Sequence, residues 1–566
     1  MTTALPEDSP VKRSAPGASH GARLTAMVNV VFILGLIVWA LVAARMSRPL
    51  LGDAVDDGQY LVGALSMRAG TGYRLVSRVG SPVARKYPPG TSTLTLLAME
   101  LVPGRPTLVK DAAVVRVLML GCAILFAIGS YRLFLLMGLG SWCSALLGLA
   151  VLFYPLVLGI SEVLNSDLPF AMISIFLLCR WAYRWQKPGS AGLRAWLVDG
   201  CLVAAAMVIR GNGFTLLLAG AAAWWLGKPK RSLAQLGVFA GIPIAVAAAS
   251  MLLIASQKGH ADTGFYGSEL VAGYSTVRHV WDIPLSNIER MPIVFTWAVW
   301  PMAKWTMPIF RFFAHHAAIR IGLGILVMAA AAVGLIPTFR RKLGPAAAVL
   351  LVLTLMVYAV WYFPFDVRYV FPILPLILGG FILAVRYAGS ALGASSRLTP
   401  IVAAVVLAGA VAPSGSLAYH AARHNWKTAA GLDPDEVAAF TAIQRVTPSD
   451  AVVFARIPEL IYLYTGRQSA PLIDDVSLAA GKPPAWHASL HWLTAASGHP
   501  IYIFGTPPTV SDDWRGAMAD DSTDATDTFV NSAPYVIQTV YLSPHDHFWL
   551  GRLTDRPKEL KEPRTK

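Results

Sequence analysis

Residues 26–44 have the sequence AMVNVVFILGLIVWALVAA, an apolar stretch without a charged side chain. A transmembrane helix needs about 20 mostly apolar residues, so this stretch predicts a membrane span. Ten further stretches have the same character, and together they predict a polytopic α-helical membrane protein with about 11 transmembrane helices. The ten stretches lie at residues 112–130, 142–160, 168–184, 196–210, 214–227, 233–255, 319–338, 344–361, 370–387 and 398–413.

The composition agrees with a membrane location. Of the 566 residues, 55% are hydrophobic and only 14% are charged, whereas a soluble globular protein has roughly 25% charged residues. The net charge is +15, but residues 1–413 contain 34 Lys and Arg against 15 Asp and Glu, while residues 414–566 contain 13 against 17. A basic excess confined to the membrane part is typical of cytoplasmic loops. It removes the main argument for binding to nucleic acid.

Lys and Arg also predict the orientation of the chain, because loops rich in them stay in the cytoplasm. The N-terminus is then cytoplasmic, and eleven crossings place the C-terminus outside. The first stretch lacks a small-residue cleavage site before Arg45, so we interpret it as an anchor and not as a signal peptide. The cations gather in alternate loops, at Arg132; Arg180, Arg184, Lys187 and Arg194; Lys228, Lys230 and Arg231; Arg340, Arg341 and Lys342; and Arg386 and Arg397.

These assignments predict the domain organisation. A cytoplasmic leader (1–25) precedes a transmembrane domain (26–413), which contains a long first outer loop (45–111) and an outer or interfacial segment (256–318). Within that segment, residues 292–313 are apolar and rich in Trp. If they formed a span, the cations at 340–342 would lie on the outer side of the membrane. We therefore expect an interfacial helix or a re-entrant segment.

The tail, residues 414–566, is expected to fold as a small extracytoplasmic α/β domain. Its apolar runs at 451–455, 501–504 and 535–541 have the length of strands, and a helical pattern covers 435–445. No cysteine lies in this tail, which excludes a disulfide framework or a thiolate metal site there. The four cysteines lie in apolar stretches and are expected to be core residues.

Polar residues that could perform chemistry gather on the predicted outer face. Asp56 and Asp57 follow the first span, and Asp56 stands three residues before Gln59. Asp56 could act as a general base at the membrane surface, or it could merely cap a helix as part of a capping box.

Cations and further acids lie on the same face. Arg85 and Lys86 precede Tyr-Pro-Pro and could hold a phosphate, or form a basic rim that binds anionic lipid. Taken alone, the turn that contains Glu162 and Asp167 favours helix capping through Ser166 or Asp167, and a functional role of its two acids is the alternative. Arg210 and Arg368 lie in the predicted outer loops, where cations are otherwise rare, and are candidates for binding an anionic ligand. Arg368 could instead pair with Asp366.

The order of these motifs resembles the GT-C superfamily of polyprenyl-phosphate-sugar-dependent glycosyltransferases. The branch that it resembles contains protein O-mannosyltransferases and the lipid A aminoarabinose transferase. The likeness rests on five short motifs, and a weaker likeness continues in residues 454–467. The motifs are Asp56-Asp57-x-x-Tyr60-Leu61, Gly70-Thr-Gly-Tyr73, Tyr87-Pro-Pro-Gly90, Ser166-Asp-Leu-Pro-Phe170 and Arg368-Tyr-x-x-Pro-Ile-x-Pro375.

The resemblance implies a role for each candidate residue. Asp56 matches the catalytic acid of the first loop, Asp57 its acidic neighbour and Asp167 the second acid. Lys86 is similar to a lysine near the donor phosphate, although Tyr87 separates it from Pro-Pro in this chain. The remaining candidates are Arg85, Arg210 and Arg368 for the donor phosphate, and Tyr60, Tyr87 and Glu162 for substrate.

The predicted reaction is an inverting single displacement, in which Asp56 takes a proton from the acceptor. The donor is a polyprenyl-phosphate sugar, and the acceptor is a protein, a lipid or a glycan in the envelope of a bacterium, outside its inner membrane. No cofactor is required by the sequence, and a divalent metal could join the carboxylates.

The alternative is a transporter or lipid flippase, which would place ionisable groups near the bilayer midplane and show two related halves. A sensor is disfavoured because all inner loops are short.

Overall fold

The structure is a computed structural model of the chain, and its described residues leave gaps. The described part comprises residues 18–46, 52, 55–104, 107–187, 192–227, 232–257, 274, 279–301, 317–361, 365, 367–393, 398–427, 434–455, 457–471, 496, 498–505, 535–542 and 549–555. Residues 1–17 of the predicted leader (1–25) and most of the segment 256–318 lie outside the described residues, whereas residues 18–25 already belong to the first helix.

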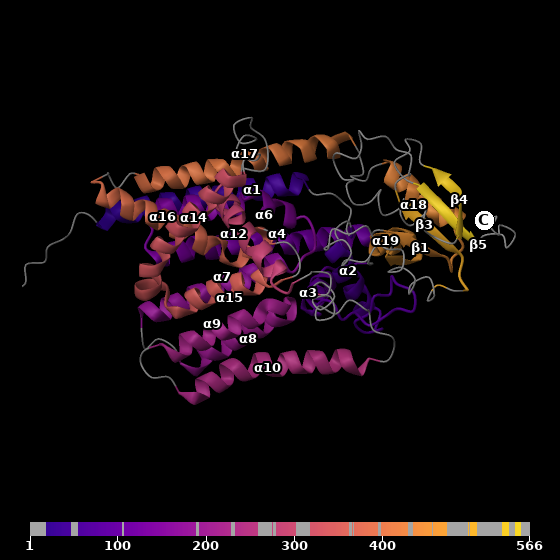
Figure 1. Cartoon of the computed structure of the whole chain (residues 1–566), viewed down its shortest axis with the longest axis horizontal. Coiled ribbons are helices and arrows are strands. Elements are labelled where there is room, and N and C mark those ends of the chain that lie inside the picture. Colours follow the sequence, from indigo (N-terminus) through magenta and orange to yellow (C-terminus); the bar gives the residue numbers. More distant parts are fainter. Residues whose placement is uncertain are drawn as a thin grey trace, which may run out of the picture.

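Every predicted span falls on a helix, which confirms the fold class. Six of the described helices are long and apolar enough to cross a membrane. Figure 1 shows the helices as a bundle that runs along the long axis of the molecule, with the C-terminal sheet at one end. The helices of the bundle are α1 (Ala18–Met46), α4 (Leu108–Met137), α5 (Ser141–Leu152), α6 (Pro155–Ile160), α7 (Asp167–Gln186), α8 (Leu193–Ile209), α9 (Phe214–Trp225), α10 (Leu233–Ser256), α12 (Asp282–Val299), α14 (Ala317–Thr338), α15 (Pro345–Ala359), α16 (Leu374–Ala391) and α17 (Leu398–Lys427).

Three predicted boundaries differ from the structure. The stretch 142–160 forms two helices, α5 and α6, because Pro155 begins α6 and the preceding Tyr154 is extended. Helix α17 continues past residue 413 to Lys427. Within the segment 292–313, residues 292–299 belong to α12, which packs against α14 and α16.

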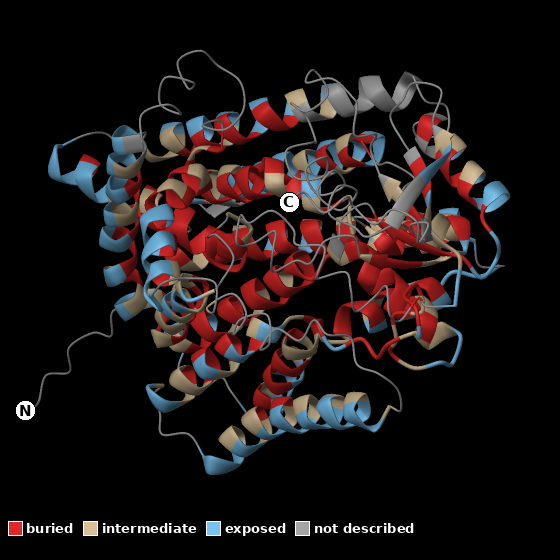
Figure 2. Ribbon diagram, turned by 45° about the vertical axis from the view of Figure 1, so that its right-hand side comes forward, coloured by how far each residue is buried: buried red, intermediate tan, exposed pale blue. Residues whose placement is uncertain are grey.

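The core of the bundle is apolar and continuous. Figure 2 shows buried residues at the centre and exposed ones along the peripheral helices. The helix α10 lies at the edge of the bundle (Figure 1), with only 11% of its apolar window buried, as expected for a helix that faces lipid. All four cysteines are free, but the expectation that all are core residues is wrong for Cys201, which is exposed.

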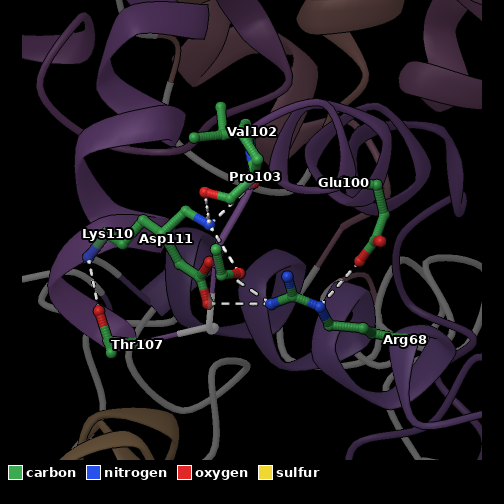
Figure 3. Close-up of polar contacts among 8 residues, drawn as sticks. Arg68, Glu100, Val102, Pro103, Thr107, Lys110 and Asp111 are labelled. Atoms are coloured by element: carbon green, nitrogen blue, oxygen red, sulfur yellow. Dashed lines mark hydrogen bonds and ion pairs between the residues drawn. The ribbon is translucent and has the colours of Figure 1, made fainter.

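The predicted first outer loop folds onto the N-terminal part of α4. It contains α2 (Val55–Arg68) and α3 (Gly90–Glu100). Figure 3 shows how Arg68, at the end of α2, joins both helices that follow: its Nε donates to Glu100 at 2.9 Å and its Nη1 to the buried Asp111 at 3.2 Å. Lys110 donates to the backbone carbonyls of residues 102–104. These charge-assisted bonds fix α2 relative to the bundle.

The C-terminal region has the α/β character that was predicted. A five-stranded sheet has the order β2-β1-β3-β5-β4, with β1 parallel to β2 and β3 and the pairs β3–β5 and β4–β5 antiparallel. The sequence did not predict β2 and β5, since β2 is short and polar and β5 contains Gly, Arg and Asp. The elements are α18 (Pro434–Val446), β1 (Val452–Ala455), α19 (Pro458–Thr465), β2 (Gln468–Pro471), β3 (Ile501–Gly505), β4 (Tyr535–Leu542) and β5 (Trp549–Asp555).

The C-terminal region docks directly onto the loop that contains α2. Glu459 of α19 is fully buried and accepts from Arg78 at 3.0 and 3.2 Å. The backbone N–H of Ser469, on β2, donates to the carbonyl of Ser77 at 2.7 Å. Helix α19 also approaches α2 so closely that a Cβ at Gly58 would lie 2.6 Å from the Cβ of Glu459. The C-terminal region and the first half of the chain are thus packed as one unit here.

We predict that Glu459→Ala loosens this docking far more than Glu100→Ala does. Removing one partner of a buried ion pair leaves the other charge buried and costs about 3–5 kcal/mol. The side chain of Glu100 is 57% exposed, and an exposed pair is worth about 0–1 kcal/mol. Hydrogen–deuterium exchange should show faster exchange in α2 and β2 for Glu459→Ala only. Equal protection in the two variants would contradict the docking.

Candidate functional site

A cavity of about 730 Å³ lies where the loop, the helix bundle and two short helical turns meet. Seven of the ten residues singled out in the sequence line it, although up to 312 positions separate them along the chain. They come from α2, the segment before α3, the start of α7, the junction between α8 and the turn η1 (Gly211–Gly213), and the turn η4 (Val367–Ile373). The seven are Asp56, Tyr60, Lys86, Tyr87, Asp167, Arg210 and Arg368.

Asp56 lies in the first turn of α2 and not at its N-cap position, so the capping-box alternative does not describe it. Its carboxylate accepts a hydrogen bond of 2.5 Å from the Tyr87 hydroxyl. The ring of Tyr60 packs against Tyr87 with 5.0 Å between centroids. Burial, together with the negative charge of Asp56, holds the pKa of the Tyr60 phenol well above its ordinary value. Tyr60 therefore stays neutral near pH 7 and cannot itself act as a base there.

Asp167 and Arg210, which also line the cavity, form an ion pair of 2.5 Å. Arg210 also donates to the hydroxyl of Ser166 at 3.0 Å. The expected cap of α7 by Ser166 or Asp167 is wrong: the side-chain oxygen of Asn165 accepts from the backbone N–H of Leu168 at 3.0 Å, and Ser166 makes no capping bond. Because Asn165 caps the helix, both Ser166 and Asp167 are available to face the cavity.

Two further cations line the cavity. Lys86 is buried, and its ammonium lies 5.5 Å from the centre of the Tyr87 ring. The guanidinium of Arg368 lies 5.0 Å from the ring of Tyr369 and donates to its hydroxyl at 3.1 Å. Arg368 is within electrostatic range of both Asp56 and Asp167. Its suggested partner Asp366 lies outside the described residues.

Three predicted site residues do not line the cavity. The carboxylate of Asp57 accepts from the backbone N–H of Gly52 at 3.1 Å, so it fixes the chain just before α2. The side chain of Arg85 is exposed to solvent. Glu162 lies within electrostatic range of Arg116, on α4. Arg85 and Lys86 therefore have different surroundings although they are adjacent in the sequence.

Other cavity residues were not predicted from the sequence. Tyr358 and Tyr369 stack with 4.4 Å between centroids and 9° between ring planes. Asn212 donates to the hydroxyl of Tyr358 at 2.6 Å. Asn212 and Tyr369 lie close in the sequence to Arg210 and Arg368, and this proximity could have identified them as site residues. Tyr358 lies inside an apolar stretch, where nothing in the sequence separates it from other core aromatics.

The chemistry available in this cavity is defined by charge and shape. Carboxylates, cations, phenols, two amides and a serine hydroxyl line part of the space, and apolar side chains form the rest of its wall. A ligand with one anionic group and a hydrocarbon chain would find partners for both of its parts. The apolar wall includes Leu156, Ile160, Val163, Leu164, Phe214, Val357 and Trp361.

We predict that Asn165→Ala lowers stability by about 1 kcal/mol, the usual cost of losing a helix N-cap. Ser166→Ala should cost less, because Ser166 makes no capping bond. Thermal unfolding of the two purified variants measures the difference. A larger loss for Ser166→Ala than for Asn165→Ala would show that the cap has been assigned to the wrong residue.

Comparison with known proteins shows the fold. No protein-family model matches the chain, and no curated protein sequence matches it. Among solved structures, ArnT from Cupriavidus metallidurans bound to undecaprenyl phosphate has a TM-score of 0.52 at 14% identity, covering 94% of this chain and 99% of that one.

An oligosaccharyltransferase from Archaeoglobus fulgidus is also similar. Its apo form has a TM-score of 0.52 at 14% identity, covering 94% of this chain and 75% of that one. Its complex with Zn and sulfate has a TM-score of 0.51 at 15% identity, covering 91% and 72%. At these identities the similarity concerns the fold alone. The chain shares the fold of ArnT and of this oligosaccharyltransferase.

Proposed function

We propose that this protein is a membrane glycosyltransferase that moves a sugar from a polyprenyl-phosphate donor to an acceptor. The observation on which the proposal rests is the cavity, which combines two carboxylates, three cations and an apolar wall. A lipid phosphate needs cations for its head group and an apolar surface for its chain. The transferred sugar needs a nearby base to deprotonate the acceptor.

The cations would bind the phosphate of the donor. Lys86 and Arg368 line the cavity although they are far apart in the sequence, and Arg368 presents a planar fork of donors that suits phosphate oxygens. The leaving group is a phosphomonoester whose second pKa is about 6, so it departs without a general acid. The cations would stabilise the negative charge that develops on it.

Asp56 would act as the base. The acceptor oxygen or nitrogen attacks the anomeric carbon, the bond from that carbon to the phosphate oxygen breaks, and its electron pair leaves with the phosphate. The acceptor proton passes to the Asp56 carboxylate, and the configuration inverts. The hydrogen bond from Tyr87 orients this carboxylate, while Asp167, fixed by Arg210, would orient the acceptor.

Ligands of the similar structures agree with this class of donor. ArnT was solved with undecaprenyl phosphate, which is the product that such a reaction would release. The oligosaccharyltransferase was solved with Zn and sulfate, and two carboxylates in one cavity are compatible with a divalent cation. Within the described part of the chain, no three His, Cys, Asp or Glu side chains form a metal-binding group. The proposed step does not require the metal.

The proposal places the protein in the inner membrane of a bacterium, with the cavity and the C-terminal region outside. The acceptor would be a protein, a lipid or a glycan of the envelope. The rival function is a transporter or flippase, which would accumulate substrate in sealed vesicles without forming a new glycosidic bond. The gathering of the charged groups in one cavity, next to a base, favours transfer.

Asp56→Asn should reduce sugar transfer by at least about 10²–10⁴-fold, the usual contribution of a general base. Membranes that contain the protein would be supplied with radiolabelled polyprenyl-phosphate sugars, and label that leaves the lipid would be counted. Asp57→Asn is the matched control, since Asp57 bonds to the backbone of Gly52. The rate of sugar transfer by Asp57→Asn should fall by no more than about tenfold, which corresponds to the loss of one hydrogen bond. Full turnover by Asp56→Asn would refute the assigned role.

Lys86→Gln and Arg368→Gln should each weaken the binding of undecaprenyl phosphate by about tenfold or more, because each removes a charged partner of the phosphate. Arg85→Gln, which changes an exposed neighbour, should leave the affinity nearly unaltered. Microscale thermophoresis of the purified variants gives the dissociation constants. If Arg85→Gln has the larger effect, the phosphate binds outside the cavity.

A further inference from the structure

A second cavity, of about 550 Å³, lies at the end of the bundle opposite to the candidate site. It is formed by the starts of α1, α5 and α17 and by the end of α16. The direction of α16 shows the separation: this helix begins directly after η4, which contains Arg368, and its last turns line the second cavity. The two cavities are therefore independent sites.

The polar side chains around this second cavity are cationic or hydroxylic. Arg386 lines it and donates to the carbonyl of Gly138 at 3.1 Å, which uses one of its five N–H donors. Lys342 is close enough to repel Arg386 electrostatically and donates to the neighbouring carbonyl of Met137 at 3.1 Å. None of the described residues that line the cavity is acidic. The hydroxyl-bearing lining residues are Thr25, Ser141, Ser390 and Thr399.

The cavity continues into an apolar surface. The lining residues Leu24 and Leu398 are 46% and 37% exposed, and one turn further along the same helices Met27 and Ile401 are 50% and 57% exposed. On helices that cross a membrane, such side chains face acyl chains. Trp142 also lines the cavity, and Trp is enriched at membrane–water interfaces. A ligand here can have its polar part at Arg386 and a hydrocarbon part along α1 and α17.

We propose that this cavity binds the head group of an anionic phospholipid. The phosphodiester would accept hydrogen bonds from the guanidinium of Arg386 and from the hydroxyls of Ser141 and Thr399, while the acyl chains follow the exposed apolar side chains. Arginine suits this role because its planar fork matches phosphate geometry. Lys342 adds positive charge nearby, and the carbonyls of Met137 and Gly138 hold both cations in place. The ligand differs from the polyprenyl donor in both its site and its role.

The test is lipid retention by the full-length protein. Nanodiscs would be made from equal amounts of phosphatidylglycerol and phosphatidylcholine, and native mass spectrometry would count the lipids that remain bound. Wild-type protein should retain phosphatidylglycerol preferentially, and Arg386→Gln should weaken this retention by at least about tenfold, because a charged hydrogen bond is lost. Arg341→Gln is the matched control: Arg341 is exposed near the same end but does not line the cavity.

A second variant and a soluble competitor complete the test. Ser390→Glu places a negative charge at the cavity without removing Arg386, and it should also abolish the preference for phosphatidylglycerol. Inorganic phosphate should not displace the lipid, because it lacks the acyl chains. Equal retention of both lipids by the wild type would overturn the proposal, as would unchanged retention by both Arg386→Gln and Ser390→Glu. Displacement by phosphate alone would show a simple anion site and would overturn it as well. Binding of undecaprenyl phosphate at the other cavity is measured separately and does not depend on this outcome.

Discussion

A charged side chain in a membrane protein must be paired or must face water, because an isolated charge in hydrocarbon is costly. The ion pair between Asp167 and Arg210 meets this constraint at the start of α7. Arg210 in turn donates a hydrogen bond to Ser166. Because Asn165 caps α7, the side chains of Ser166 and Asp167 can both face the cavity. The pair thus fixes one wall of the candidate site, and a second wall, with Asp56 and Tyr87, comes from the loop. Two walls from distant parts of the chain meet because each is anchored separately.

The C-terminal region contributes to the second wall. Glu459 and Arg78 form a buried pair, and α19 lies against Gly58, two residues after Asp56. Arg68 ties the other end of α2 to α3 and α4. Helix α2 is therefore held at its end by the ion pairs of Arg68, and near its start by the close packing of α19 against Gly58. A carboxylate intended for proton transfer needs such fixed geometry, since small displacements of a catalytic group are expensive.

The sequence predicted the helices well because the length and apolar character of a membrane span are strong signals. It missed the break at Pro155, since an apolar run hides a proline turn. It missed β2, since the four residues Gln-Ser-Ala-Pro have no strand pattern. At the site, motif order indicated Asp56, Asp167 and Arg368, but not which neighbours face the cavity. Lys86 and Arg85 are equivalent in the sequence, and only folding buries the first and exposes the second. Tyr358 had no signal at all, because a buried tyrosine in an apolar helix resembles any core aromatic.

The central claim is that one cavity binds a lipid phosphate beside the Asp56 carboxylate. An experimental structure of the full-length protein with undecaprenyl phosphate tests it most directly. We expect the phosphate within hydrogen-bonding distance of Lys86 and Arg368, with the isoprenoid chain along the apolar wall that contains Trp361 and Phe214. Density for the phosphate outside this cavity, with Lys86 and Arg368 still bonded only to protein, would contradict the account.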